Sequence, residues 1–201
     1  RTPRPGATHR GESDLTAFWI SLFIVFVAEL GDKTQLVAMA FATRYSAKLV
    51  LAAVLVATLL VHLFSVFLGE AAGSILPDFW IKLLAGVSFI AFGLWTLRGD
   101  TLSDEETKKT VRFGPFLTVA IAFFLAELGD KTMLATISVA TQYPSFAGVW
   151  IGSTLGMVAA DGLAIGVASV LGKRLPERAI KLGASAIFFV SGAVTLWQAF
   201  R

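Results

Sequence analysis

The chain has 201 residues, of which 56% are hydrophobic and 15% charged, and its mean hydropathy of +0.75 lies above the range of soluble domains. It contains no cysteine, which excludes disulfides, thiolate metal sites and thiol redox chemistry. The net charge of +3 comes from Lys and Arg residues that lie mostly between apolar runs, so it indicates membrane topology rather than nucleic-acid binding.

The apolar runs predict six membrane spans in two groups of three. Residues 1–14 are polar and include Pro3, Pro5 and Gly6, so we expect a flexible tail. The first three runs cover residues 15–42, 47–69 and 79–97, and after a charged linker at 99–112 three more cover residues 113–141, 146–172 and 178–200. Each run approaches or exceeds the ~20 residues that a span requires. We therefore expect an all-α polytopic membrane protein, with one three-helix repeat at 15–98 and a second at 113–201.

A six-residue sequence occurs once in each half. The segment from Glu29 to Thr34 reads Glu-Leu-Gly-Asp-Lys-Thr, and the same residues return from Glu127 to Thr132. Because each half has an odd number of spans, the second half must enter the membrane from the opposite side, which makes the two repeats inverted. More Lys and Arg lie on the side of the linker, so we expect a cytoplasmic linker and both termini outside.

The repeated motif places carboxylates inside predicted spans. An Asp or Lys at a span centre costs about 2.5–3.5 kcal/mol, so a cluster of them indicates function. In a continuous helix the acidic residues and the Lys of each motif share one face, and Gly31 and Gly129 would let helices approach closely. A fifth carboxylate lies in the span at 146–172. The candidate metal ligands are Glu29, Asp32, Glu127, Asp130 and Asp161.

Other polar residues of the spans are candidates for supporting roles. Lys33 and Lys131 are placed as counter-ions to Glu29 and Glu127, four residues away in each motif. Hydroxyl, amide and imidazole groups could be ligands or hydrogen-bond partners between helices. The residues concerned are Thr34, Thr132, Gln35 and His62.

The oxygen donors indicate the kind of cation. Carboxylate, hydroxyl and amide oxygens suit Ca²⁺ and Mn²⁺, and soft metals lack their preferred ligands here. Crowded carboxylates take up protons when no cation is present, so competition between metal and protons gives a physical basis for cation/proton exchange. We expect Mn²⁺ or Ca²⁺ as the transported substrate and no prosthetic group.

The duplicated motif, Glu29 to Thr34 and Glu127 to Thr132, resembles the signature of the Gdt-type Mn²⁺/Ca²⁺ cation transporter family, also called the transmembrane protein 165 family. The similarity covers the chain from Leu15 onward. It implies a secondary transporter that exchanges Mn²⁺ or Ca²⁺ against H⁺ by alternating access and binds the cation through the acidic residues of the motif. The compact six-span form resembles bacterial members, which implies Mn²⁺ efflux across a bacterial plasma membrane.

Two other functions compete with cation exchange. An exporter of a cationic organic solute such as lysine would also use an acidic site. A metal-dependent intramembrane enzyme is less favoured, because the chain shows no nucleophile–base set, and we therefore expect that it is not an enzyme. The expected partners are divalent metal ions, protons and the lipid bilayer, with no nucleic acid and with a homodimer as one candidate assembly.

Overall fold

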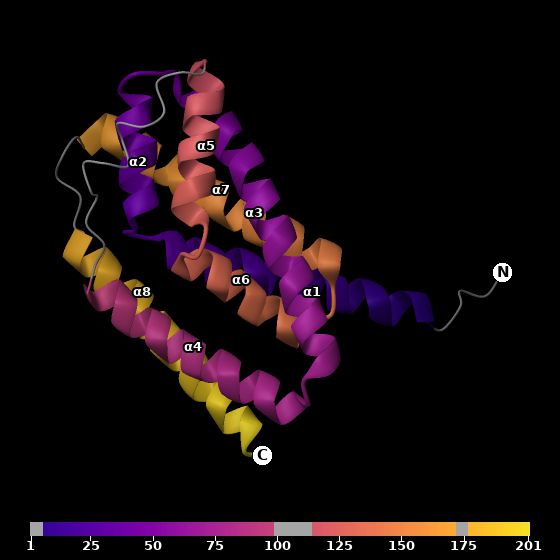
Figure 1. Cartoon of the computed structure of the whole chain (residues 1–201). Helices are drawn as coiled ribbons and strands as arrows, with labels where there is room; N and C mark the ends of the chain where they lie inside the picture. Colours follow the sequence, from indigo (N-terminus) through magenta and orange to yellow (C-terminus); the bar gives the residue numbers. More distant parts are fainter. Residues whose placement is uncertain (1–5, 99–113, 172–176) are drawn as a thin grey trace.

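The computed structural model describes residues 6–98, 114–171 and 177–201, apart from the side chains of residues 6–11, Lys33, 168–171, 177 and 179–181. These residues form helices and no strand, as the sequence predicts (Figure 1). The predicted linker at 99–112 lies outside the described residues. The helices are α1 (Gly6–Glu29), α2 (Lys33–Ala42), α3 (Ala47–Ile75), α4 (Asp78–Arg98), α5 (Pro115–Glu127), α6 (Lys131–Gln142), α7 (Phe146–Leu171) and α8 (Glu177–Ala199).

Four helices are long and apolar enough to cross a membrane, and they fall in four of the six predicted spans. Their membrane-length segments are Ala47–Ile75, Asp78–Arg98, Phe146–Val167 and Leu182–Ala199. A fifth candidate is the pair Glu12–Glu29 and Thr34–Ala42, which is bent by 75° at the first motif. The run predicted at 113–141 is divided into the short helices α5 and α6. Continuous helices at 15–42 and 113–141 were therefore a wrong prediction, because both break at the motif.

The N-terminal segment differs from the expected flexible tail. Helix α1 begins at Gly6, so the part of the predicted tail from residue 6 onward is helical. The two prolines precede this point, and no proline lies between Gly6 and Asp14. The hydroxyl of Ser145 donates a hydrogen bond of 2.6 Å to Oδ1 of Asp14. This contact ties the start of α1 to the segment that precedes α7.

Glycines on α7 set the closest helix pair, α1 with α7. A Cβ atom on Gly148 would lie 2.6 Å from the carbonyl oxygen of Asp14. One on Gly152 or Gly156 would overlap the carbonyl oxygens of Phe18 and Leu22. The contacts advance together along both chains, so α1 and α7 run in the same direction. Only glycine permits this separation of the backbones.

Helices α4 and α8 form a second pair that glycines hold close. A Cβ on Gly86 would lie 2.7 Å from Leu196, and one on Gly93 would lie 2.7 Å from the ring of Phe189. Contacts advance along α4 while they recede along α8, so the two helices are antiparallel. Figure 1 shows them side by side at one edge of the molecule.

Helices α3 and α7 cross in antiparallel directions. The indole nitrogen of Trp150 donates to the carbonyl oxygen of Leu59 at 2.9 Å, and the Thr58 hydroxyl lies 3.0 Å from the Met157 sulfur. Further along α7, a Cβ on Gly162 would lie 3.7 Å from Leu51. These contacts hold α3, the long helix of the first half, against α7, the long helix of the second half.

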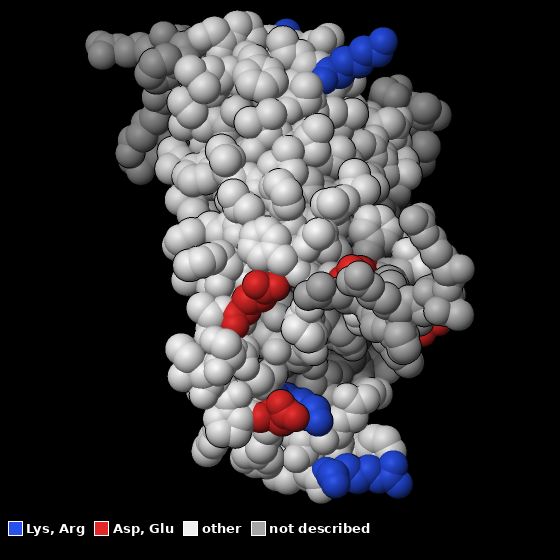
Figure 2. Space-filling model, turned by 90° about the vertical axis from the view of Figure 1, so that its right-hand side faces the viewer, with Lys and Arg blue, Asp and Glu red and all other residues white. Residues whose placement is uncertain are grey.

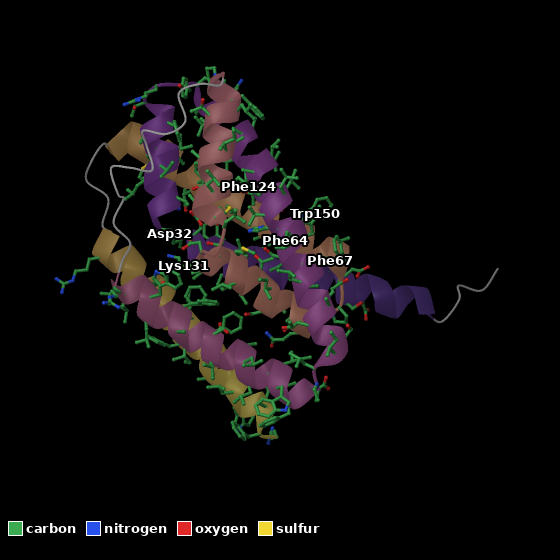
Figure 3. All side chains as sticks on the ribbon, in the orientation of Figure 1. Asp32, Phe64, Phe67, Phe124, Lys131 and Trp150 are labelled. Carbon is green, nitrogen blue, oxygen red and sulfur yellow. The ribbon has the colours of Figure 1, made fainter. Side chains whose placement is uncertain are left out.

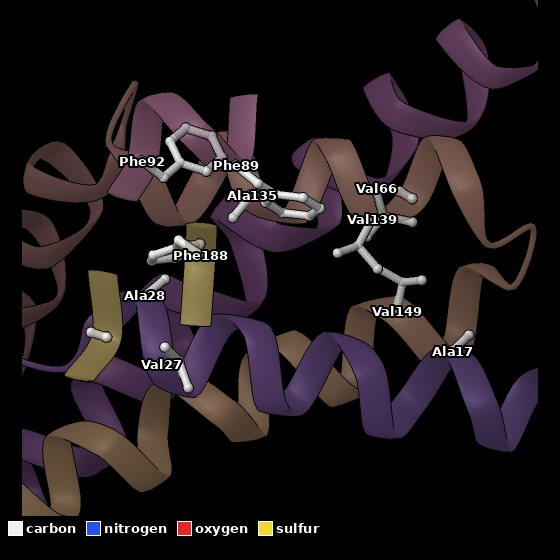
Figure 4. Packing of buried hydrophobic residues seen from close by; sticks show 12 residues of the cluster. Ala17, Val27, Ala28, Val66, Phe89, Phe92, Ala135, Val139, Val149 and Phe188 are labelled. Carbon is white, nitrogen blue, oxygen red and sulfur yellow. The ribbon is translucent and has the colours of Figure 1, made fainter. Parts of the chain in front are cut away.

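Two apolar clusters form the interior. The first joins α1, α3, α4, α6, α7 and α8 and includes Val27, Phe89, Val139 and Phe188 (Figure 4). The second joins α2, α3, α5 and α7 and includes Phe123. On the face in Figure 2, charged side chains gather at the ends and in the lower half, and a broad uncharged area covers the rest. Buried apolar clusters and an uncharged outer surface are what a bilayer requires.

Candidate functional site

Both copies of the motif lie at breaks in the helices. Helix α1 ends at Glu29 and α5 ends at Glu127, and the next helices begin four residues later, at Lys33 and Lys131. Gly31 and Gly129 have φ angles of 74° and 79°, in the left-handed region that glycine adopts without strain. A chain with a residue in this region cannot continue as a right-handed helix.

The breaks correct two predictions made for continuous helices. The acidic residues and the Lys of one motif do not share a helix face, because one helix ends at the Glu and the next helix begins at the Lys. Gly129 does not serve close helix contact either, since a Cβ there would meet no atom within 4 Å. The role of this glycine is its positive φ.

The residue after each glycine is the N-cap of the next helix through its extended backbone conformation, without a hydrogen bond from its side chain to that helix. Asp32 has φ −82° and ψ 163°, and Asp130 has φ −77° and ψ 168°, both extended conformations typical of an N-cap. Neither carboxylate accepts a hydrogen bond from the helix that it precedes. The helix starts at Asp32 and Asp130 therefore depend on backbone conformation, and the carboxylates do not cap these helices.

The structure brings the acidic residues of both halves together. All five candidate carboxylates are buried, with exposed fractions of 0% for Glu29, Glu127 and Asp161, 1% for Asp32 and 3% for Asp130. Glu29 lies within electrostatic range of Asp161, Glu127 and Asp32, and Glu127 lies within range of Asp130, Asp32 and Asp161. Like charges at such range in a buried space cannot all stay ionised without cations or protons.

Threonines from both motifs donate hydrogen bonds to one carboxylate, that of Glu29. The Thr34 hydroxyl donates a hydrogen bond to Oε1 of Glu29, and the Thr132 hydroxyl donates one of 3.4 Å to Oε2 of the same residue. Both threonines are fully buried. Glu29 is thus held by the motif of its own half and by the motif of the other half.

The buried lysine pairs across the two halves. Nζ of Lys131 lies 2.9 Å from Oδ1 of Asp32, and both side chains are almost fully buried (Figure 3). The expected pair of Lys131 with Glu127 was wrong, because the break ends the helix that would have brought these two side chains onto one face. The side chain of Lys33 lies outside the described residues, so its predicted pair with Glu29 remains a prediction.

This ion pair should contribute strongly to stability. Replacement of Lys131 by Met leaves the Asp32 charge buried, so we expect a loss of about 3 kcal/mol in the free energy of unfolding. The double variant Lys131→Met with Asp32→Asn should regain at least half of it, because no charge is then left without its partner. Thermal unfolding in detergent measures both, with Lys48→Met, an exposed lysine, as the control. A double variant less stable than the single one would contradict the pairing.

Some carboxylates of the cluster lack hydrogen-bond donors among the described residues. The oxygens of Asp130 and Asp161 are buried and accept no hydrogen bond from any described residue. Buried polar atoms are normally satisfied, so a proton or a cation is the natural partner of these groups. Among the residues that the structure describes, no three Asp, Glu, His or Cys side chains are close enough to hold a metal ion together. The carboxylates share one space without a ready set of three ligands.

The family of the chain is evident from the segments that contain the two breaks. Residues 17–104 and 115–201 match the family described as "Divalent cation/proton antiporter GDT1". The chain belongs to the GDT1 family. It is therefore a transporter and not an enzyme, as the sequence predicts.

Relatives of this GDT1 protein match it over nearly their whole length. A protein of Vibrio cholerae described as "Putative manganese exporter" is 34% identical over 92% of both chains. GDT1-like protein 5 of Arabidopsis thaliana is 27% identical over 90% of this chain and 96% of its own. The divalent cation/proton antiporter GDT1 of Saccharomyces cerevisiae is 24% identical over 94% of this chain and 86% of its own. No solved structure matches the chain.

His62 is a further buried polar residue of this GDT1 protein. It lies on α3, is fully buried, and neither ring nitrogen has a hydrogen-bond partner among the described residues. The structure places it in no group of three metal-ligating side chains. Its role as a proton relay, ligand or packing residue remains a prediction.

Gln35 and Met133 follow the two motifs at equivalent positions. Gln35 was named as a supporting residue, but Met133, which follows the second motif at the same position, was missed. Each accepts a hydrogen bond from the left-handed glycine of its own break. A comparison of the two halves one residue beyond Thr34 and Thr132 would have found Met133.

Proposed function

We propose that the chain exports Mn²⁺ across a bacterial plasma membrane in exchange for protons, with Ca²⁺ as a second substrate. The observation that carries this proposal is the cluster of five buried carboxylates, drawn from both motifs and Asp161, with one described lysine among them. The family supports a divalent cation and a proton as the exchanged species. The name of the Vibrio cholerae relative supports manganese and export.

The charges of the cluster explain why the two ions compete. Lys131 compensates Asp32, and the carboxyl groups of Glu29, Glu127, Asp130 and Asp161 remain. Like charges crowded into a dehydrated space are unfavourable unless cations or protons neutralise them. A divalent cation needs the ionised forms, so its binding releases protons. Alternating exposure of such a site to the two sides of the membrane couples the two fluxes.

We further infer that the two halves are inverted repeats of three spans each, with a broken first span. The order of elements supports this, since a broken pair and two long helices occur in each half. The antiparallel directions of α3 with α7 and of α4 with α8 also support it, because each pair occupies equivalent places in the two halves. The distribution of Lys and Arg favours both termini outside and the linker in the cytoplasm.

The alternatives have less support. The family describes cation/proton antiporters, which gives an intramembrane enzyme no support. A lysine exporter would need a site for an organic solute, whereas the side chains that contact the carboxylates in the described part of the chain include two threonines and one lysine. A competition experiment between Mn²⁺ and lysine separates the two transport functions.

Calorimetric titration at two pH values tests the exchange directly. We expect Mn²⁺ to bind the purified chain with release of protons, and the affinity to rise from about pH 6 to about pH 8 by roughly tenfold per pH unit for each proton displaced. Titrations in two buffers of different ionisation enthalpy count these protons. Ca²⁺ and Mg²⁺ provide the comparison of selectivity. Tight binding of Mn²⁺ with no proton release would contradict the proposal.

A further inference from the structure

Both breaks contain a left-handed glycine, but different side chains accept the hydrogen bond from its N–H group. In the first, the N–H of Gly31 donates to Oε1 of Gln35 at 2.9 Å, and in the second the N–H of Gly129 donates to the sulfur of Met133 at 3.3 Å. The amide of Gln35 also has a donor, and its Nε2 bonds the carbonyl oxygen of Ala160 on α7 at 3.1 Å. A thioether has no donor, so Met133 cannot tie its break to another helix in this way.

Helix packing also differs between the two halves. Helix α1 lies against α7 at the three glycines Gly148, Gly152 and Gly156. The register of Thr58 with Thr154 aligns these glycines with Ala52, Val56 and Leu60 of α3, which are exposed. Helix α3 instead shares the second apolar cluster with α5 through side chains, among them Ala53 and Ala57. Among the described residues, α3 and α5 therefore have no glycine-lined contact of the kind that joins α1 and α7.

An apolar groove lies between α3 and α5. It has a volume of about 730 Å³ and is lined by Leu60, Phe64 and Phe67 of α3, by Phe124 of α5, by Leu128 in the second break and by other apolar side chains. Figure 3 shows Phe64, Phe67 and Phe124 on this side of the molecule. Helix α3 is fastened on its other sides, to α7 through Trp150 and to α6 at Gly69. At the groove, α5 is the partner of α3 and packs on it through side chains.

We propose that α5 and the second break move during transport, and that Gln35 is a positioning residue that holds the first break fixed on α7. This inference rests on the proposed cation exchange. The fixed part contains Glu29 and Asp161, the neighbour of Ala160. The moving part contains Glu127, the last residue of α5. Movement of α5 over α3 changes the position of Glu127 relative to Glu29 and Asp161 and so makes and breaks the cation site.

Cross-linking tests which interface moves, and the absence of cysteine from the chain makes introduced thiols specific. The groove variant is Phe64→Cys with Phe124→Cys. The matched control is Asp14→Cys with Ser145→Cys, whose native side chains are 2.6 Å apart at α1 and α7. Both are reconstituted and treated with bifunctional methanethiosulfonate reagents, and mass spectrometry of the intact chain confirms each link. Mn²⁺ transport is measured before the link, with the link and after reduction.

We expect the link across the groove to lower transport at least about tenfold, with recovery on reduction, and the link between α1 and α7 to leave it within about twofold. Unchanged transport with the groove linked, or a block by the α1–α7 link, overturns the inference. If the first groove variant does not fold, Leu63→Cys with Leu128→Cys spans the same groove. Failure of the unmodified protein to transport Mn²⁺ would instead defeat the proposed function.

A substitution tests the role of Gln35. Gln35→Met gives the first break the residue that the second break has, and we expect the KM for Mn²⁺ to rise about tenfold while kcat stays within about twofold. Gln142→Met is the control, since the Gln142 amide donates a hydrogen bond within α6, to the carbonyl oxygen of Ser138. A fall in kcat at unchanged KM would show that Gln35 acts in the motion itself and would overturn its role as an anchor.

Discussion

Replacement of Glu29 by Gln is expected to lower Mn²⁺-driven proton flux in proteoliposomes at least about 100-fold. Glu29 is fully buried, accepts hydrogen bonds from the threonines of both motifs, and lies within range of Glu127 and Asp161. The amide keeps the size of the side chain and removes the charge that a cation requires. A pH-sensitive dye inside the vesicles reports the proton movement, and Mn²⁺ uptake is measured in parallel.

The same change at a span end supplies the control. Glu70 lies near the end of α3 and is half-buried, so Glu70→Gln should keep transport within about twofold. Thermal unfolding in detergent checks that the Glu29 variant is folded. Full transport by folded Glu29→Gln would show that this carboxylate is not part of the path, and the proposed exchange would lose its central residue.

A single added methyl group at Gly152 is expected to destabilise the chain by about 3 kcal/mol, at the upper end of the range for overpacking. The Cβ of an alanine there would overlap the carbonyl oxygen of Phe18 and the hydroxyl of Ser21, and neither α1 nor α7 can withdraw without loss of their neighbouring contacts. Gly152→Ala should therefore lower the unfolding temperature in detergent markedly.

Gly166 lies further along the same helix and provides the comparison. A Cβ at this position would meet no atom within 4 Å, so Gly166→Ala should be neutral or stabilising by up to about 1 kcal/mol through helix propensity. Equal stability of the two variants would mean that α1 and α7 do not pack as closely as the structure shows. The proposed fixed half of the site would then have no structural basis.

Hydropathy predicted the long helices well, and it could not predict the breaks. The runs at 47–69, 79–97, 146–172 and 178–200 correspond to α3, α4, α7 and α8, because a continuous apolar run of this length has few alternatives in lipid. The breaks depend on φ at one glycine. Glycine followed by aspartate is a C-terminal stop joined to an N-cap, and this local signal was available at Gly31 and Asp32.

The clustering of the acidic residues could be predicted from the sequence, and the ion pair within the cluster could not. The duplicated motif and Asp161 indicated that carboxylates of both halves meet, which the structure shows. The partner of Lys131 was wrong, because helical spacing applies only within one helix and the true partner, Asp32, comes from the other half. Contacts between segments a hundred residues apart depend on packing, which residue spacing does not encode.

The three glycines of α7 have no equivalents on α3, and this bears on whether the two halves are interchangeable. Two identical halves would make the same helix contact twice, either close in both places or wider in both. In this chain glycines make the contact of α1 with α7 close, and the equivalent positions of α3 hold residues with side chains. A tandem chain built from two first halves would therefore lack the glycine-lined contact altogether.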